Sequence, residues 1–159
     1  MRLNLFYDDP NITTEKMKEL ELCSDDLKVG QEVAFITQRQ LGDSWSRCFE
    51  TFRFGKIERI TPKRRDVTLR VGKDETHVVK SYQTLYKADD ALIHHAKNTK
   101  KRNNVLRKMQ KIADSWGYQS KENIEKNIRN LSDDEFGEIC QKVDDFETTL
   151  LKLCGKEVE

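Results

Sequence analysis

Basic side chains gather in the middle of this chain, where they could bind the phosphate backbone of a nucleic acid. The 159 residues carry a net charge of +1, but residues 30–118 carry +9, and the segments 1–29 and 119–159 carry −3 and −5. A phosphate backbone is a line of negative charge, and several cations set along a groove release its counterions. The uneven charge therefore bears on the partner of the chain rather than on its fold.

The densest group of cations lies in a turn that the sequence predicts between two strands. Thr61–Asp66 places three consecutive cations on an exposed turn, and outward positions of the flanking strands and of the following helix add more. The residues predicted to contact phosphates are Arg53, Lys56, Arg59, Lys63, Arg64, Arg65, Arg70, Lys100, Lys101, Arg102 and Arg107. Trp45, if exposed, would stack on unpaired bases. Such contacts predict weak sequence preference and strong salt dependence.

The same cations have two other uses, which the sequence leaves open. They could form an ordinary solvated surface, because basic side chains are common on soluble domains. The acidic segment 119–159 could instead pack against the basic middle, so that the chain would neutralise itself. If that acidic segment is exposed, it could dock a basic partner.

Five pairs of adjacent aspartates suggest a metal or nuclease site, but helix geometry opposes that interpretation. Adjacent helical residues point about 100° apart, so a pair does not converge on one ion. Two of the pairs, Asp89-Asp90 and Asp133-Asp134, come at predicted helix starts, where carboxylates cap the helix and complement its dipole. We expect capping or surface roles and no metal site.

The three histidines offer no recognisable catalytic constellation. His94 and His95 lie at the start of a predicted helix and His77 lies in a predicted strand, and none has an acidic or cysteine partner at ligand spacing. The chain also lacks a phosphate loop, a dinucleotide fingerprint and a nucleophile elbow. We therefore expect a protein that is not an enzyme and has no cofactor.

Cysteine spacing and hydropathy indicate a cytoplasmic protein. The four cysteines are too far apart for a zinc site, and we expect them to be reduced and mostly in the core. No stretch approaches the ~18 apolar residues of a membrane span. Residues 1–9 are too short and too acidic for a signal peptide.

Five short strands within residues 27–88 would position the predicted turn and its cations. After a glycine turn at Gly30, the expected strands are 31–36, 49–60, 67–71, 76–80 and a last one within 81–87. A long loop over 38–48 would hold Trp45, and Gly55 would mark a bulge or sharp bend. Tyr82, Leu85 and Tyr86 are the expected packing residues at the end of this region.

This segment resembles the SH3-like barrel superfamily, which includes the Tudor and KOW domains. The resemblance rests on Val29-Gly30-Gln31-Glu32-Val33, on Gly55-Lys56-Ile57-Glu58-Arg59-Ile60 and on the hairpin that follows. It implies a five-stranded barrel that docks partners through its loops. The segment also resembles small barrel proteins encoded by bacteriophages.

Helical periodicity precedes and follows the predicted strands. A short helix is expected over 14–22, and apolar residues recur at three- and four-residue spacing from Leu92 to Trp116. That stripe is polar at Thr99 and Asn103, which predicts that the helix breaks near 97–104 or leaves the protein body there. Gly117 would end it.

Two further helices are expected near the C-terminus. A short one follows Ser120, with an apolar face that includes Ile128. The last begins at Ser132-Asp133-Asp134-Glu135, a capping box in which serine and glutamate satisfy each other's backbone donors.

The sequence thus predicts an α+β protein with three regions. Residues 1–26 form a lead-in with a short helix, 27–88 form a five-stranded SH3-like barrel, and 89–159 form about three helices that pack on the barrel or make a small subdomain. The leading hypothesis is a nucleic-acid-binding protein that contacts DNA or RNA phosphates. The alternative is a protein-interaction module, for example a phage or mobile-element product that inhibits a host enzyme.

Overall fold

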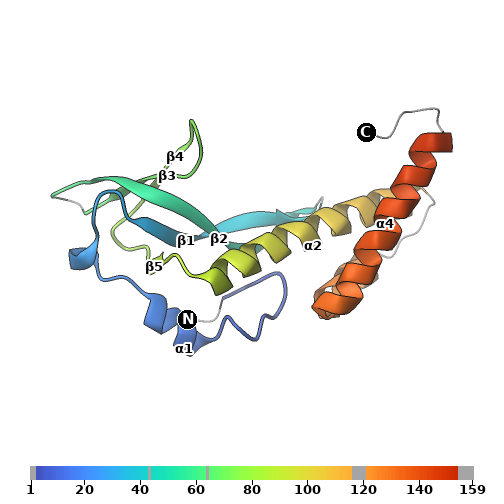
Figure 1. The fold of residues 1–159 in the computed structure, drawn as a ribbon, viewed down its shortest axis with the longest axis horizontal. Coiled ribbons are helices and arrows are strands. Elements are labelled where there is room, and N and C mark those ends of the chain that lie inside the picture. The colour runs from blue at the N-terminus through green and yellow to red at the C-terminus, as the bar shows by residue number, and fades with distance from the viewer. Residues whose placement is uncertain (1–2, 43, 64, 116–120, 154–159) are drawn as a thin grey trace. The chain divides into compact units, whose positions relative to one another are not determined.

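A computed structural model describes residues 3–42, 44–63, 65–115 and 121–153 of the chain (Figure 1). Within these residues the fold is α+β, with a five-stranded antiparallel sheet and four α-helices. The elements are α1 (Thr14–Leu20), the 3₁₀ turn η1 (Ser24–Asp26), β1 (Glu32–Leu41), β2 (Ser44–Ile60), β3 (Val67–Arg70), β4 (Thr76–Val79), β5 (Leu85–Lys87), α2 (Asp90–Ser115), α3 (Lys121–Asn130) and α4 (Asp133–Leu153).

Two compact units make up the structure. The sheet unit is drawn from Met1–Arg39 and Cys48–Thr99, and the helical unit from Gln40–Arg47 and Lys100–Glu159. The N-terminal lead-in therefore belongs with the sheet. The β1–β2 turn and most of α2 belong with the C-terminal helices.

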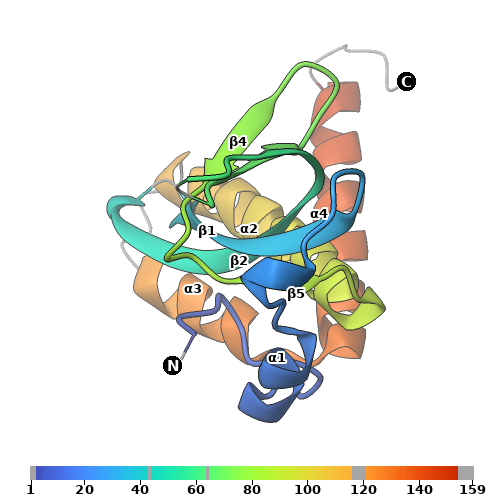
Figure 2. The same ribbon diagram turned by 90° about the vertical axis from the view of Figure 1, so that its left-hand side faces the viewer.

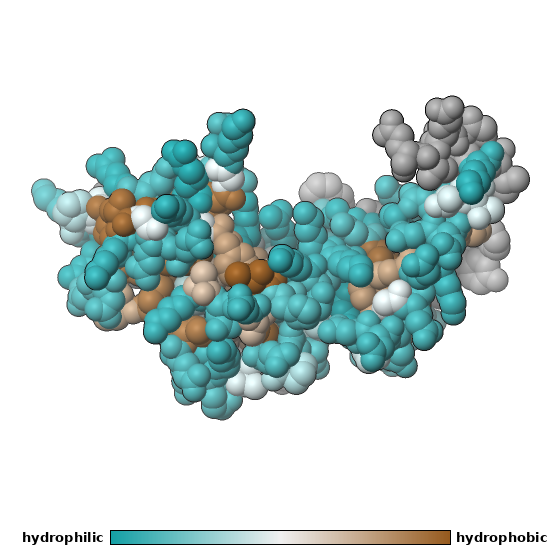
Figure 3. Space-filling view, in the orientation of Figure 1, coloured by the Kyte–Doolittle hydropathy of each residue, from teal (hydrophilic) through white to brown (hydrophobic). Residues whose placement is uncertain are grey.

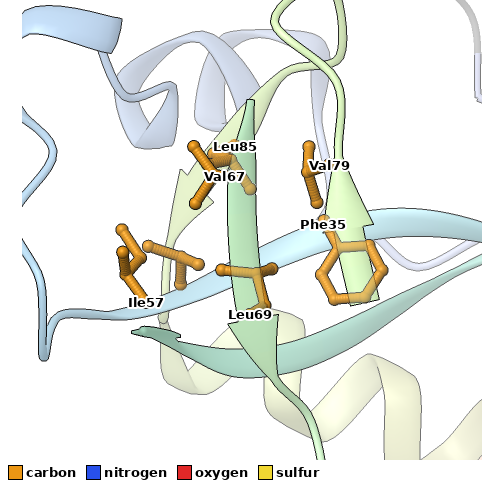
Figure 4. Close-up of a cluster of buried hydrophobic side chains, with 7 residues drawn as sticks. Phe35, Ile57, Val67, Leu69, Val79 and Leu85 are labelled. Atoms are coloured by element: carbon orange, nitrogen blue, oxygen red, sulfur yellow. The ribbon is translucent and has the colours of Figure 1, made fainter. Parts of the chain in front are cut away.

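Alternating side chains give the sheet two apolar faces. One face carries the cluster of Figure 4, made of Val33, Phe35, Ile57, Val67, Leu69, Val79 and Leu85. Ala34 and Tyr86, which pair across β1 and β5, point to the opposite face, because successive strand residues alternate. Met17 of α1 and Leu92 of α2 cover that second face, and α1 lies beside β5 (Figure 1, Figure 2).

The sheet is open, so the expected closed barrel is wrong. Its order is β4-β3-β2-β1-β5, with β4 and β5 at the two edges. The outer edge of β5 is already taken by the segment after α1. Glu21 forms an antiparallel bridge with Tyr86, and the Leu22 N–H donates to the Leu85 carbonyl at 2.8 Å. This pairing occupies the edge that a closing strand would need.

The expected loop over residues 38–48 is instead the end of a long hairpin. β1 continues to Leu41 and β2 starts at Ser44, with a turn at Gly42, whose φ is +53°. The Gly42 N–H donates to the Asn103 Oδ1 atom at 2.8 Å, and the Asn103 Nδ2 atom donates to the Gln40 carbonyl at 3.1 Å. A helix side chain therefore holds this turn in place.

Gly55 has a different role from the one expected. The β2–β3 register shifts between Ile57 and Arg59, so the irregularity lies at Glu58 rather than at Gly55. A Cβ atom at Gly55 would lie 2.9 Å from the Val71 Cγ1 atom and 3.0 Å from the Arg70 carbonyl oxygen. Glycine is needed there because the chain passes too close for a side chain.

Helix α2 is unbroken, contrary to the expected break near 97–104. It runs from Asp90 to Ser115, and the two polar positions of its stripe, Thr99 and Asn103, are buried. Asn103 is polar because it binds the β1–β2 turn. The expected stripe end at Trp116 and stop at Gly117 lie outside the described residues.

The capping box of the last helix is confirmed. The Ser132 N–H donates to Glu135 Oε2 at 2.9 Å, and the Glu135 N–H donates to Ser132 Oγ at 3.3 Å. The Ser132 hydroxyl and backbone hydrogen bonds hold the pKa of the Glu135 carboxyl below its usual 4.5.

Hydrophilic residues cover most of the face shown in Figure 3, and hydrophobic residues appear there in separate small areas. None of the helices in the described part of the chain is long and apolar enough to span a membrane.

Candidate nucleic-acid interface

Strand register brings several of the predicted cations to one exposed face of the sheet unit. Lys56 of β2 pairs with Arg70 of β3, and Arg59 pairs with Thr68. The neighbouring pair Ile57 and Leu69 is buried, so these cations point the other way. We call this surface the cationic sheet face. Its strand residues are Lys56, Arg59, Thr68, Arg70, Thr76 and Val78, and we include Lys80, which is exposed directly after β4.

Positive charge is only partly balanced on the cationic sheet face. Lys56 and Arg70 sit directly opposite each other, an arrangement that is unfavourable for like charges. The Arg70 Nε atom donates to Glu58 Oε1, and Glu58 stands at the bulge of β2. Lys56 and Arg59 are exposed, and neither forms an ion pair with a carboxylate of the described residues.

The turn between β2 and β3 extends the cationic sheet face. Lys63 is exposed at its tip, and Arg64 lies outside the described residues. Arg65 has a positive φ of 53° and donates to Ser24 Oγ at 3.1 Å and to Asp25. The turn is closed by the Thr61 N–H, which donates to the Asp66 carbonyl at 2.9 Å.

Asp66 fastens this turn to the end of β4. Its carboxylate accepts from Lys80 Nζ at 3.1 Å and from the Ser81 N–H at 3.2 Å. Lys80 was not among the predicted site residues. Lys80 comes directly after β4, and its continued alternation with Thr76 and Val78 is the sequence signal that predicts its exposure.

A pocket of about 160 Å³ opens beside the turn. Arg65, Lys80 and Tyr82 are among its lining residues. Tyr82 is 85% exposed, so its expected packing role is wrong, whereas Leu85 and Tyr86 are buried as expected. Tyr82 lies in the short β4–β5 connection, where no strand alternation indicates whether a side chain is buried or exposed.

Arg53 does not join the cationic sheet face. It precedes Lys56 by three residues on β2 and therefore points to the other side of the strand. Its guanidinium is half-buried and donates to Glu75 Oε2 at 2.8 Å. Arg53 thus binds the turn between β3 and β4, where Glu75 lies.

The predicted cations of α2 belong to the helical unit, and Arg102 is buried there. Its side chain is 1% exposed and lies over the Phe136 ring, 4.6 Å from the ring centre. It donates to the carbonyls of Ile128 and Leu131 at 2.9 and 3.1 Å, and to Asp133 Oδ1 at 2.7 Å. Arg102 is therefore too buried to contact a phosphate backbone.

Three more cations of α2 also have contacts inside the helical unit. Arg107 donates to the Gly42 carbonyl at 3.1 Å, and the Lys101 ammonium lies 5.9 Å from the centre of the Phe136 ring. Hydrogen bonds to Glu147 and Asp144 raise the pKa of Lys108 above its usual 10.5. Lys100 is exposed.

Part of the basic segment is therefore neutralised by the chain itself. Arg102 and Lys108 pair with carboxylates of α4, which is the self-neutralisation that the sequence left open. Trp45 lies at the start of β2, and its side chain is outside the described residues.

A buried acid–histidine pair lies elsewhere in the sheet unit. The Asp9 Oδ2 atom is 3.1 Å from His95 Nδ1, the two side chains are 5% and 0% exposed, and the Tyr7 ring stacks on the imidazole at 4.7 Å. Burial raises the pKa of Asp9, but the Asn11 N–H and the His95 ring outweigh it, so the pKa lies below 3.8.

Comparisons with protein-family models, curated proteins and solved structures find no match to this chain. Among the described residues, no group of three or more His, Cys, Asp or Glu side chains could hold a metal ion. The candidate site is therefore the cationic sheet face with its turn, where exposed cations are only partly balanced by carboxylates.

Proposed function

We propose that this chain is a non-enzymatic nucleic-acid-binding protein that holds a phosphate backbone on the cationic sheet face. One observation carries the proposal, the β2–β3 register that sets Lys56 and Arg59 beside Arg70 on an exposed surface. Phosphates are bound by cations at several points along a track, and each contact releases counterions. The face and its turn supply such a track.

The repulsion between Lys56 and Arg70 favours a binding role for these residues over a role in solubility alone. Like charges directly opposite on a sheet destabilise it, and a soluble surface has no need to pair Lys56 with Arg70. An anion lying between the two side chains would remove that repulsion. The ion pair of Arg70 with Glu58 is partly exposed, and exposed pairs contribute only about 0–1 kcal/mol, so a phosphate can replace the carboxylate.

The proposed interface is narrower than the set predicted from sequence. It keeps Lys56, Arg59, Lys63, Arg65 and Arg70 and adds Lys80. Arg102 and Arg107 are left out because they have structural partners in the helical unit. Lys100 and Lys101 are left out because they belong to that unit and not to the sheet unit. Contacts to phosphates alone give weak sequence preference.

Charge reversal on the sheet tests the proposal. Lys56→Glu with Arg59→Glu should weaken binding to DNA or RNA by about tenfold or more at low salt, because two phosphate contacts become repulsive. The measurement is fluorescence anisotropy with labelled single-stranded and duplex oligonucleotides. Lys18→Glu with Lys97→Glu is the matched control, since it removes two exposed cations of the same unit and gives the same net charge.

Two outcomes would contradict the proposal. One is the absence of binding to any nucleic acid at low salt. The other is an equal loss in both double variants, which would mean that net charge matters and that the position of the cations does not.

We also propose that the open sheet is a variant of the SH3-like fold. The supporting feature is the strand order, in which β1 lies between β2 and the last strand. The short β4–β5 connection, closed by the Gln83 N–H donating to the Lys80 carbonyl at 2.8 Å, fits the same layout.

The second candidate function is a protein-interaction module, for example one that inhibits a host enzyme. It is favoured by β4, an edge strand with Val78 47% exposed. Edge strands offer backbone donors and acceptors to a strand of another chain. A lysate partner that survives nuclease digestion and is lost when Val78→Lys is introduced would favour this candidate.

A further inference from the structure

Tyr82 is presented to solvent by a turn whose backbone is held on both sides. The Gln83 N–H donates to the Lys80 carbonyl at 2.8 Å, and the Lys80 N–H donates to Gln83 Oε1 at 2.9 Å. The Ser81 N–H donates to Asp66 Oδ1 at 3.2 Å. A fixed turn therefore carries a ring that is 85% exposed.

An exposed aromatic ring on a fixed turn is suited to stacking. Tyrosine offers a large flat surface with few rotatable bonds, so little conformational entropy is lost when it binds. Every nucleobase has a π-face, and stacking on an aromatic side chain is tolerant of sequence. The faces of a paired base are covered by its neighbours in the duplex, so only an unpaired base offers one.

Two cations lie near Tyr82. Arg65 and Lys80 line the same pocket as the ring, and Lys80 also belongs to the cationic sheet face. A strand whose phosphates contact Arg65 and Lys80 would therefore place a base near the Tyr82 ring.

The ion pairs in this pocket do not prevent phosphate binding. The side chains of Arg65 and Asp25 are 57% and 68% exposed, so their pair is weak and exchangeable. Lys80 is 47% exposed and keeps two further donors besides the one that binds Asp66. Both cations can thus contact a phosphate while the turn keeps its backbone hydrogen bonds.

We propose that Tyr82 is a stacking platform for an unpaired base and that the protein therefore prefers single-stranded nucleic acid to duplex. This inference rests on the proposed function, because the same cations must hold the backbone. It adds the class of ligand, which is a flexible single strand. It also names Tyr82 as the residue that distinguishes a single strand from a duplex.

The experiment compares Tyr82→Ala, Tyr82→Phe and the wild-type chain in anisotropy titrations with a labelled oligothymidine strand and a duplex of equal length. Tyr82→Ala should weaken single-strand binding by about fivefold to 150-fold, which corresponds to the loss of one stacked base. Tyr82→Phe, which keeps the ring, should bind as the wild type does. Duplex binding should be the same in all three chains.

The outcomes separate the inference from the proposed function. Binding of both forms with equal affinity, unchanged in Tyr82→Ala, would overturn the inference and leave phosphate binding in place. No binding to either form would overturn both. A nuclease-resistant protein partner lost in Tyr82→Ala, with single-strand binding unchanged, would assign the ring to a protein contact and overturn the inference. Circular dichroism should show the wild-type fold, because the ring is exposed.

Discussion

Asp9 and His95 show how single side chains join distant segments of the sheet unit. The carboxylate and imidazole are buried together under the Tyr7 ring, and they tie the N-terminal segment to the start of α2. A buried carboxylate is stable as an anion only when hydrogen bonds compensate for its lost hydration. The Asn11 N–H, 2.9 Å from Asp9 Oδ1, supplies one and the His95 ring supplies another.

The Asp9 interaction makes the stability of the chain depend on pH in the acid range. The folded-state pKa of Asp9 lies below its usual 3.8, so the unfolded chain binds the proton more readily. This stabilisation is present above pH 3.8 and is lost as the pH falls through the folded-state value. Asp9→Asn should therefore lose less stability on acidification than the wild type, as measured by urea denaturation at a series of pH values.

The prediction would be contradicted if the free energy of unfolding fell with pH equally in Asp9→Asn and in the wild type. Asp8→Asn, which removes the neighbouring exposed carboxylate, is the matched control.

The helices of the helical unit meet around one buried guanidinium. Arg102 of α2 binds the carbonyls of Ile128 and Leu131, where α3 ends, and the carboxylate of Asp133, where α4 begins. Carbonyls at a helix end have no partners within the helix and need donors from elsewhere. The five-donor fork of arginine can reach several acceptors at once.

Replacement of Arg102 should loosen these three helices. Arg102→Ala should lower the free energy of unfolding by about 2–4 kcal/mol, because several hydrogen bonds to a charged group are lost and buried carbonyls are left without donors. The free energy of unfolding of Arg102→Lys should lie between those of the wild type and Arg102→Ala. Lysine keeps the positive charge but lacks the several donors of the guanidinium group. The measurement is urea denaturation of the full chain followed by circular dichroism.

Lys100→Ala is the control for Arg102, since an exposed substitution on the same helix should change stability by no more than about 0.5 kcal/mol. An equally small change in Arg102→Ala would show that the guanidinium is not what holds the helices.

Local patterns in the sequence predicted the features that depend on residues close to each other in the chain. The capping box of α4 could be read directly, because Ser132 and Glu135 are three residues apart. The strands β3 and β4 follow from alternation. The burial of Arg102 could not be predicted from the sequence, because the acceptors of its hydrogen bonds are 26 to 31 residues away.

Long-range contacts also explain the two errors that matter for the site. The loop expected before Cys48 is a hairpin because Asn103, 61 residues from Gly42, binds the turn. The turn that carries the exposed ring of Tyr82 is held in part by Asp66, which is 15 residues from Ser81 in the sequence. The face shared by Lys56, Arg59 and Arg70 depended on a strand register that includes a bulge, which no local pattern indicated.

At the scale of the whole molecule, basic charge is divided between two uses. In the helical unit, Arg102 and Lys108 are bound by carboxylates and carbonyls of the chain. In the sheet unit, Lys56 and Arg59 are exposed on a face with a surplus of positive charge. The net charge of +1 therefore conceals an uneven distribution of charge, and we propose a polyanion as the partner of the cationic sheet face.

The most direct test of binding on this face is the dependence of affinity on salt. For a single strand, each neutralised phosphate contributes about −0.7 to the slope of log K against log salt concentration, so the six cations of the proposed interface predict a slope of about −4. In Lys56→Glu with Arg59→Glu the slope should be shallower by about 1.4, because two contacts are gone. A wild-type slope near zero, or an unchanged slope in the double variant, would contradict the account.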